Sequence, residues 1–331
     1  MVISRTPFRI SFFGGGSDYP VWYKENYGAV LATTINKYCY ISCRYLPPFF
    51  EHKSRIIYSK IEFIKTIEQI EHPSVRECLR FMKINKGVEI HHDGDLPARA
   101  GMGSSSTFTV GMLHTLYALK GIMPTKRQLA TDAIYIEQKI IKENVGSQDQ
   151  ILAAFGGFNL IEFGGIDGFS VRTITVNPAR LKEFQDYLML FFTGLSRTAS
   201  QVAAEQIKVI PKRKKELRLM LEMVGEGLKI INSNRRLSDF GKLLHENWKI
   251  KCSLSSKIST PLIDEIYSTA IRAGALGGKL LGAGGGGFVL FFAEPDVHKK
   301  IKEKLKKFLY VPFRFETSGS QIIFYSQNDA I

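Results

Sequence analysis

The chain of 331 residues is long enough to bury a sizeable core, and its length favours two domains of ordinary size. Its composition, 44% hydrophobic and 23% charged, excludes an intrinsically disordered chain, and no apolar run reaches the length needed to span a membrane. The N-terminus lacks the apolar core of a signal peptide, and the four cysteines form no C-x-x-C pair, so we expect a cytoplasmic protein with reduced thiols.

The net charge of +14 is compatible with nucleic acid, an anionic membrane surface or phosphorylated small molecules as partners. Much of the excess lies in two clusters, at residues 208–218 and 299–307. Both clusters are interleaved with apolar residues at helical spacing, which favours solvated helix faces, and no nucleic-acid-binding motif accompanies them. We therefore expect neither a nucleic-acid nor a membrane partner.

The first third of the chain is predicted to form a mostly antiparallel sheet. Residues 8–13 are predicted as a strand that leads into the turn 14–20, where three glycines let the backbone approach a ligand. Asp18 in this turn can accept hydrogen bonds from sugar hydroxyls, or it can cap the segment that follows. Further strands are expected at 30–35 and 38–43, on either side of Asn36 and Lys37, and at 54–58 and 87–92, with a helix at 74–84.

A loop rich in glycine and serine, residues 95–108, separates the last of these strands from a predicted helix at 108–119. The first N–H groups of a helix have no intrahelical partner and the helix dipole favours negative charge there, so such a loop suits phosphate. The alternative is a serine-capped helix after a glycine turn. The loop is not the common P-loop, because Ser104 stands where that pattern needs Lys, and it lacks the closing glycine of a G-x-S-x-G nucleophile elbow.

Two acidic residues follow the loop on predicted helices. Glu137 lies within a helix expected at 125–143, with Thr125 as its N-cap, and Asp149 opens a short helix that ends at Gly156. Taken alone, Glu137 can be an exposed helix residue and Asp149 an N-cap. Beside a phosphate loop, one carboxylate can hold a divalent ion on the phosphates and the other can face an attacking hydroxyl.

A domain boundary is expected near Asn177, which gives an N-terminal ATP- and sugar-binding domain, 1–177, and a C-terminal domain, 178–331. Strands are predicted at 158–163, 171–176, 187–193, 289–292 and 321–325, and helices at 201–209, 214–232, 238–251, 261–273 and 294–309. The glycines between 282 and 287 match the spacing of a dinucleotide-binding loop, but a strand follows instead of a helix, so we reject that fold. Close packing of this backbone against another loop or a ligand is expected.

Three segments in order, Arg9–Tyr19, Pro97–Ser106 and Gly282–Gly287, resemble the motifs of the small-molecule kinases named after galactokinase, homoserine kinase, mevalonate kinase and phosphomevalonate kinase, the GHMP family. This resemblance implies an α+β fold with two domains, an N-terminal one like a ribosomal-protein domain and a ferredoxin-like C-terminal one. Within the family, the first segment is most similar to that of bacterial D-glycero-D-manno-heptose 7-phosphate kinases, with fucokinases second. Gly15 and Gly16 stand where galactokinases carry Glu-His, which argues against galactose as the substrate.

The resemblance also implies roles for individual residues. The ATP phosphates would be bound by Gly101, Met102, Gly103, Ser104, Ser105 and Ser106. Ser105 and Glu137 would bind Mg²⁺, while Asp149 would face the substrate hydroxyl with Arg9 beside it. Because an arginine at that place keeps the carboxylate ionised, we expect Asp149 to orient the hydroxyl and accept its proton late. The substrate-binding residues would be Gly14, Gly15, Gly16, Ser17, Asp18, Gly284 and Gly285.

The activity implied is transfer of the ATP γ-phosphoryl to the anomeric hydroxyl of a heptose 7-phosphate, for the synthesis of nucleotide-activated heptose used in surface polysaccharide. The distal phosphate of such a substrate needs a basic cradle, for which Arg99, Lys279 and the basic second half are candidates. The alternatives are a kinase acting on L-fucose or another free sugar and, more distantly, a non-catalytic nucleotide- or RNA-binding protein. The sequence leaves the oligomeric state open, a homodimer included.

Overall fold

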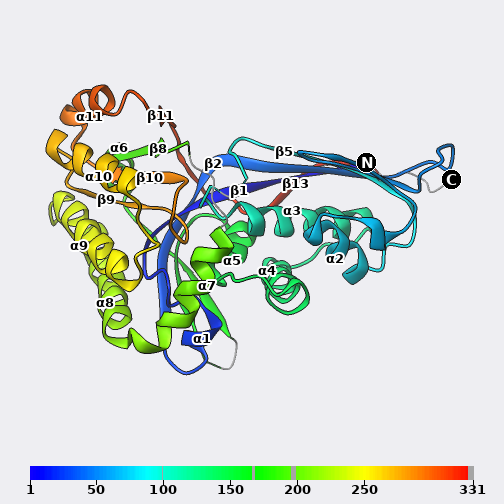
Figure 1. Cartoon of the computed structure of the whole chain (residues 1–331), viewed down its shortest axis with the longest axis horizontal. Coiled ribbons are helices and arrows are strands. Elements are labelled where there is room, and N and C mark those ends of the chain that lie inside the picture. Colours follow the sequence, from blue (N-terminus) through cyan, green and yellow to red (C-terminus); the bar gives the residue numbers. More distant parts are fainter. Residues whose placement is uncertain (99, 166–167, 195–198, 327–331) are drawn as a thin grey trace.

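The structure, a computed structural model, describes residues 1–98, 100–165, 168–194 and 199–326. Within these residues the chain forms a nine-stranded sheet, built mainly from its first half, and a four-stranded sheet from its second half. Helices cover one face of the large sheet, which extends well beyond the rest of the molecule (Figure 1). They are α2 (Pro73–Phe81), α3 (Ser104–Leu119), α4 (Lys126–Tyr135) and α5 (Gln148–Phe155).

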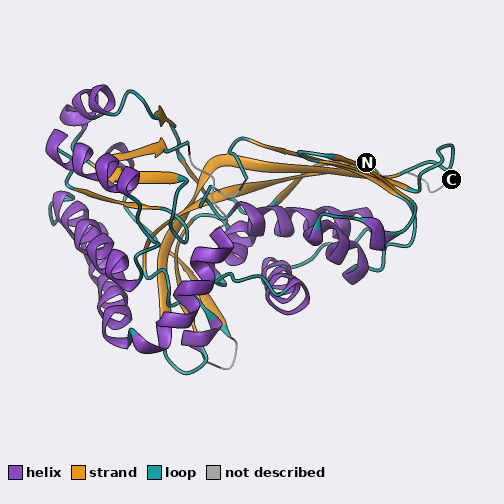
Figure 2. Cartoon of the chain, in the orientation of Figure 1, coloured by secondary structure: helices purple, strands orange, loops and turns teal. Residues whose placement is uncertain are grey.

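The large sheet is organised around two long antiparallel strands, β1 (Val2–Phe13) and β2 (Gly28–Tyr45). Its main path runs β13-β1-β2-β5-β3-β4, while β6 and β12 also pair with β2, and β7 pairs with β6. The remaining strands of this sheet are β3 (Ser54–Ile57), β4 (Ile61–Ile64), β5 (Val88–Gly94), β6 (Phe158–Phe163), β7 (Phe169–Thr173), β12 (Phe315–Glu316) and β13 (Gln321–Tyr325). Figure 2 shows helices and strands as two layers over most of this half.

The predicted break at Asn36 and Lys37 is wrong, because β2 continues through both residues. The pairing of β1 with β2 shifts at this point, from Pro7 opposite Tyr38 to Arg9 opposite Thr34, so the polar pair lies in a bulge. The Asn36 side chain accepts a hydrogen bond from the backbone N–H of Arg314 at 2.6 Å. The local pattern indicates a turn at Asn36 and Lys37. The structure has instead a continuous strand, in which Asn36 is bonded to Arg314, 278 residues later in the sequence.

The second half of the chain forms the small sheet, whose strand order is β11-β8-β10-β9. Its strands are β8 (Leu188–Phe192), β9 (Gly277–Leu280), β10 (Phe288–Phe292) and β11 (Leu309–Tyr310). The helices around it are α6 (Pro178–Asp186), α7 (Ala199–Val209), α8 (Lys214–Ile231), α9 (Ser238–Leu254), α10 (Pro261–Ala273) and α11 (His298–Lys304). After this sheet the chain returns to the large one, where β12 pairs with β2 and β13 with β1. The boundary expected near residue 177 stays a prediction. The last two strands, β12 and β13, lie after it in the sequence but belong to the sheet of the first half.

Short elements complete the chain and account for two differences from the predicted helices. They are α1 (Pro20–Tyr23), η1 (Ile67–Gln69), η2 (Ile136–Ile141), η3 (Ile210–Lys212) and η4 (Pro295–Val297). The helix expected at 125–143 begins as predicted, with Thr125 as N-cap, but continues beyond α4 as the π-helix η2. The helix expected at 294–309 is divided into η4 and α11.

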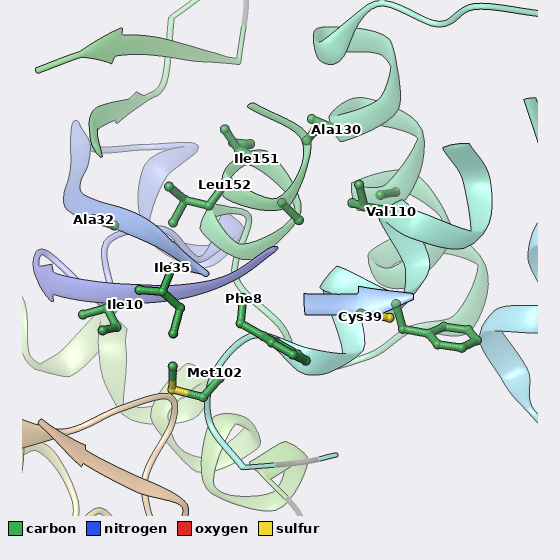
Figure 3. Packing of buried hydrophobic residues seen from close by; sticks show 14 of the residues in the cluster. Phe8, Ile10, Ala32, Ile35, Cys39, Met102, Val110, Ala130, Ile151 and Leu152 are labelled. Carbon is green, nitrogen blue, oxygen red and sulfur yellow. The ribbon is translucent and has the colours of Figure 1, made fainter. Parts of the chain in front are cut away.

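Buried aromatic side chains join the two halves. Phe184 of α6 lies 4.8 Å from Phe240 of α9 and 5.5 Å from Phe12 of β1, measured between ring centroids. Beneath the glycine–serine loop, Met102 packs into the core near Phe8 and Ile10 (Figure 3). The apolar core is thus continuous across the junction where the loop lies. Among the described residues, no helix combines the length and the apolar character that crossing a membrane requires.

Candidate active site

A cavity of about 310 Å³ lies at the junction of the two halves. One wall is the turn that follows β1, a second is the loop that opens α3, and a third is the segment that leads into α5. The second half contributes residues of α7, α9 and β9 and the start of the second glycine run, Gly282 and Ala283. Stretches that are distant in sequence, from both halves of the chain, therefore meet around one space.

The loop that opens α3 has the geometry of an anion-binding helix start. Gly101 and Gly103 both have left-handed backbones, with φ values of +81° and +76°, and Gly103 is the N-cap of α3 without a side-chain cap. A Cβ on Gly103 would lie 3.3 Å from both Arg9 Cγ and Asp149 Oδ2, so glycine keeps the loop close to these side chains. A helix start of this kind, without a side-chain cap, suits an anion.

The expected close packing of the second glycine run is confirmed. A Cβ on Gly282 would lie 2.6 Å from Gly101 Cα, and one on Gly287 would lie 2.1 Å from the Ala100 carbonyl oxygen. Only residues without a side chain allow the two loops to touch in this way. Gly284 and Gly285 pack against Ile258: a Cβ on Gly284 would lie 2.8 Å from Ile258 Cα, and the N–H of Gly285 donates to the Ile258 carbonyl. Their role in substrate binding stays a prediction.

An arginine–carboxylate pair stands beside the first loop. Arg9 of β1 is 5% exposed, and its Nε and Nη2 donate to the two carboxylate oxygens of Asp149 at 2.6 and 2.7 Å. Nη1 of Arg9 donates to the Gly101 carbonyl at 2.8 Å. Asp149 lies in the first turn of α5, where the helix dipole also stabilises its charge, but Ser147 is the N-cap. Asp149 is therefore not the N-cap of α5, and its carboxylate is paired with Arg9 instead.

Asp18 is 2% exposed and lines the same cavity. Its carboxylate accepts hydrogen bonds from the Gly16 N–H and from Gln148 Nε2, both at 2.9 Å, so it links the turn after β1 to the start of α5. Burial raises the pKa of Asp18, and the negative charge of Asp149 adds to that rise. A Cβ on Gly146 would lie 1.9 Å from Asp18 Oδ2, so the segment before α5 leaves room for this carboxylate.

Glu137 is completely buried rather than exposed on a helix. It lies in η2, and its carboxylate accepts hydrogen bonds from Ser106 Oγ at 2.7 Å, from Thr109 Oγ1 at 2.8 Å and from Gln150 Nε2. Burial, followed by the charge of Glu143, raises its pKa to about 7, although the two hydroxyl donors favour the ionised form. This carboxylate anchors the first turn of α3 from behind the loop.

Binding of Mg²⁺ by Ser105 and Glu137 stays a prediction, and in the structure it is Ser106 that contacts Glu137. Successive helix residues point about 100° apart, so Ser106 faces Glu137, while Ser105 is exposed and donates to Glu143 Oε2 at 3.3 Å. A Mg²⁺ ion that is bound to ATP phosphates takes one or two carboxylates from the protein. Glu137 accepts three hydrogen bonds, and a carboxylate has about four acceptor positions, so one remains for a cation. Glu137 is fully buried and does not line the cavity, so the oxygens that face the cavity and fit such an ion are those of Ser105 and Glu143, while a role for Glu137 stays a prediction.

The other predicted site residues either line the cavity or hold its walls in place from behind. Gly15 and Gly16 line it, whereas a Cβ on Gly14 would lie 1.9 Å from the Ala29 carbonyl oxygen, so that glycine holds the turn against β2. Ser17 Oγ donates to the Gly14 carbonyl at 2.8 Å and is buried. Met102 has no exposed surface, so its side chain supports the loop from the core. Ser104 lines the cavity, as do Ser105 and Ser106.

Several lining residues were not identified from the sequence, namely Tyr19, Glu143, Gln148, Gln206 and Lys251. A signal existed for Lys251, because it continues the buried stripe of α9 formed by Leu244, Trp248 and Leu254. Lys279, a candidate for the phosphate cradle, does line the cavity. Arg99, the other named candidate, lies outside the described residues.

Comparison with protein families assigns both halves of the chain. Residues 65–157 match the family "GHMP kinases N terminal domain" and residues 228–311 match "GHMP kinases C terminal". Together with the fold, these matches define a small-molecule kinase. The chain belongs to the GHMP kinases, which are ATP-dependent phosphotransferases, and the expected α+β fold of that family is confirmed.

Among individual relatives, the D-glycero-alpha-D-manno-heptose 7-phosphate kinase of Campylobacter jejuni is 28% identical over 92% of this chain and 93% of that protein. The L-fucokinase/L-fucose-1-P guanylyltransferase of Bacteroides fragilis is 27% identical over 73% of this chain, which spans only 26% of that longer protein. A crystal structure of a D-glycero-D-manno-heptose 1-phosphate kinase from Bacteroides thetaiotaomicron superimposes with a TM-score of 0.74 at 24% identity, covering 99% of this chain and 100% of that one. The last comparison bears on the fold alone.

Proposed function

We propose that this kinase phosphorylates the anomeric hydroxyl of D-glycero-D-manno-heptose 7-phosphate, giving the 1,7-bisphosphate. The observation that carries the proposal is the Arg9–Asp149 pair, which shares one cavity with Asp18 and with the glycine-lined start of α3. In this cavity the Asp149 carboxylate can accept the proton of a bound hydroxyl, and the N–H groups at the start of α3 can bind the phosphates of ATP. The Campylobacter jejuni relative supports this acceptor, because its similarity extends over nearly the whole of both chains.

In the reaction, the anomeric oxygen forms a bond to the γ-phosphorus while the bond from that phosphorus to the β–γ bridging oxygen breaks, and ADP leaves. Asp149, held by Arg9, orients the hydroxyl and accepts its proton as the new bond forms. A guanidinium has five N–H donors and Arg9 uses three of them, so two remain for developing phosphate charge. Mg²⁺ held by Ser105, Glu137 and Glu143 would neutralise charge on the β- and γ-phosphate oxygens.

Asp18 is assigned to the sugar. Because its carboxylate is buried and already accepts two hydrogen bonds, it has remaining acceptor positions that point to hydroxyl donors rather than to bulk water. Gly15 and Gly16 present backbone without side chains at the same wall, which leaves space for a bulky acceptor. These features support a polyhydroxylated substrate.

The test is ATP- and Mg²⁺-dependent phosphorylation of a panel containing heptose 7-phosphate, L-fucose, galactose and mannose, with ³¹P NMR to locate the new phosphate. The proposal expects an anomeric phosphate on heptose 7-phosphate, with the highest kcat/KM of the panel. A preference for L-fucose would support the second candidate, a free-sugar kinase, which the similarity to the Bacteroides fragilis protein favours. Absence of turnover with every sugar would refute both.

A further inference from the structure

Two buried lysines enter the cavity from the second half of the chain. Lys251 of α9 is 7% exposed and Lys279 of β9 is 3% exposed, and both line the cavity. The ammonium of Lys251 donates to the Gly282 carbonyl at 2.6 Å, and that of Lys279 donates to the Phe12 carbonyl at 2.8 Å. Since an ammonium has three donors, each lysine keeps two after its main-chain bond.

Neither lysine forms an ion pair with a carboxylate of the described residues. Arg9, the third cation of the cavity wall, is matched by Asp149, and the Asp18 carboxylate acts on the lysines only from a distance. Burial lowers the pKa of Lys251 to about 8, and burial together with the charges of Lys251 and Arg9 lowers that of Lys279 well below its usual range. The two lysines therefore form a pair of buried amines, neither of which is directly paired with a carboxylate of the described residues.

A purely structural role explains this pair poorly. Burying an ammonium without a carboxylate is costly, whereas a neutral donor could satisfy the Gly282 or Phe12 carbonyl at a smaller cost. An anion that enters the cavity would offset the cost, because hydrogen bonds between ammonium and phosphate are charge-assisted. The pair is thus arranged for an anionic ligand.

The position of the pair indicates which phosphate this is. Phosphates of the nucleotide have the N–H groups at the start of α3, on the first half of the chain. Lys279 is tied to Phe12, next to the end of β1, and β1 leads directly into the turn that carries Gly15, Gly16 and Asp18. This lysine therefore stands beside the wall that is assigned to the sugar.

We propose that Lys251 and Lys279 bind the phosphate group that the sugar acceptor already carries, so that the cavity selects phosphorylated sugars over free ones. This inference rests on the proposed function and deepens it by assigning the acceptor's phosphate to two residues. The presence of these two lysines, rather than overall similarity to a relative, would then distinguish a kinase of sugar phosphates from a kinase of free sugars.

The test measures binding without turnover, by calorimetry with a non-hydrolysable ATP analogue present. The probes are D-glycero-D-manno-heptose 7-phosphate and unphosphorylated D-glycero-D-manno-heptose, and the variants are Lys251→Met and Lys279→Met, which keep most of the side-chain length. Each variant should bind the phosphorylated sugar about 10- to 100-fold more weakly, the effect of losing charged hydrogen bonds, and the free sugar within about twofold of wild type. Lys279→Arg, which keeps the charge, should recover part of the affinity.

A matched control is Lys249→Met, on the same helix but with a side chain that is 57% exposed and paired with Glu246, and it should bind both sugars normally. Equal losses for both sugars, or weaker binding of the ATP analogue, would overturn the inference and assign the lysines to structure or to the nucleotide. Failure of the proposed function looks different, because it would appear as absent turnover in the sugar panel. Turnover of free sugars without any preference for the phosphorylated one would leave a sugar kinase and refute both heptose 7-phosphate as the substrate and the lysine assignment.

Discussion

Replacing Glu137 with Gln should change how the stability of the protein depends on pH. The carboxyl is fully buried, and burial with the charge of Glu143 raises its pKa from 4.5 to about 7. Between these two pH values the folded protein keeps a proton that the unfolded chain has lost. The free energy of unfolding therefore falls as the pH rises from about 4.5 to about 7, and this contribution is level above that range.

The size of the effect follows from the same pKa values. Each pH unit between 4.5 and about 7 contributes about 1.4 kcal/mol, so wild type should lose about 3 kcal/mol across the interval through this one group. Glutamine cannot ionise, so the Glu137→Gln variant lacks this loss. Measured against wild type, the variant should become more stable by about 3 kcal/mol between pH 4.5 and pH 8.

The assay is urea unfolding of both proteins at half-unit steps of pH. The difference between the two stability curves isolates Glu137, because other groups titrate alike in both proteins. Glu246→Gln serves as control, since the Glu246 side chain is 56% exposed and its substitution should leave the slope unchanged. A difference between wild type and Glu137→Gln that stays constant with pH would refute the assignment of a raised pKa to this carboxyl.

Three further predictions concern the cavity. Asp149→Asn should lower kcat by about 10²- to 10⁴-fold through loss of the proton acceptor, while calorimetry shows the affinity for an ATP analogue within about twofold of wild type; unchanged kcat would remove Asp149 from the mechanism. Gly146→Ala would place a methyl group 1.9 Å from Asp18 Oδ2, so steady-state kinetics should show a raised KM for the sugar and an unchanged KM for ATP. Binding of heptose 7-phosphate should weaken as the pH rises through about 8, because Lys251 then loses its charge; affinity that stays constant up to pH 9 would contradict this.

Much of the fold could be predicted because its elements carry local signals. The apolar run in β1, the apolar spacing of α3 and the Thr125 cap of α4 each place an element from a few neighbouring residues. The errors arise where distant contacts override such signals. Asn36 lies in a bulge, where its side chain accepts a hydrogen bond from the N–H of Arg314 near the end of the chain. A different error is β9, which was not predicted because two of its four residues are glycines.

Less of the candidate site than of the fold could be predicted from the sequence. Spacing and resemblance indicate Arg9 and Asp149, but no local pattern states that residues 140 positions apart share two hydrogen bonds. The burial of Glu137 could not be foreseen, because it depends on the π-helical η2 and on hydroxyl donors from α3. The position of Lys251 on the apolar stripe of α9 could have indicated a functional residue, because burying an ammonium without a carboxylate partner is costly.

The contact between the two glycine runs explains how both halves of the chain can define one acceptor site. Gly101 and Gly282 meet backbone to backbone, Arg9 donates to the Gly101 carbonyl, and Lys251 donates to the Gly282 carbonyl. The guanidinium that holds Asp149 and the ammonium proposed for the acceptor's phosphate are therefore anchored on opposite sides of a single close contact. Since a methyl group at either glycine would separate the loops, we expect the spacing between the reacting hydroxyl and the distal phosphate to depend on Gly101 and Gly282. On this basis we expect the site to select the length of the acceptor as well as its charge.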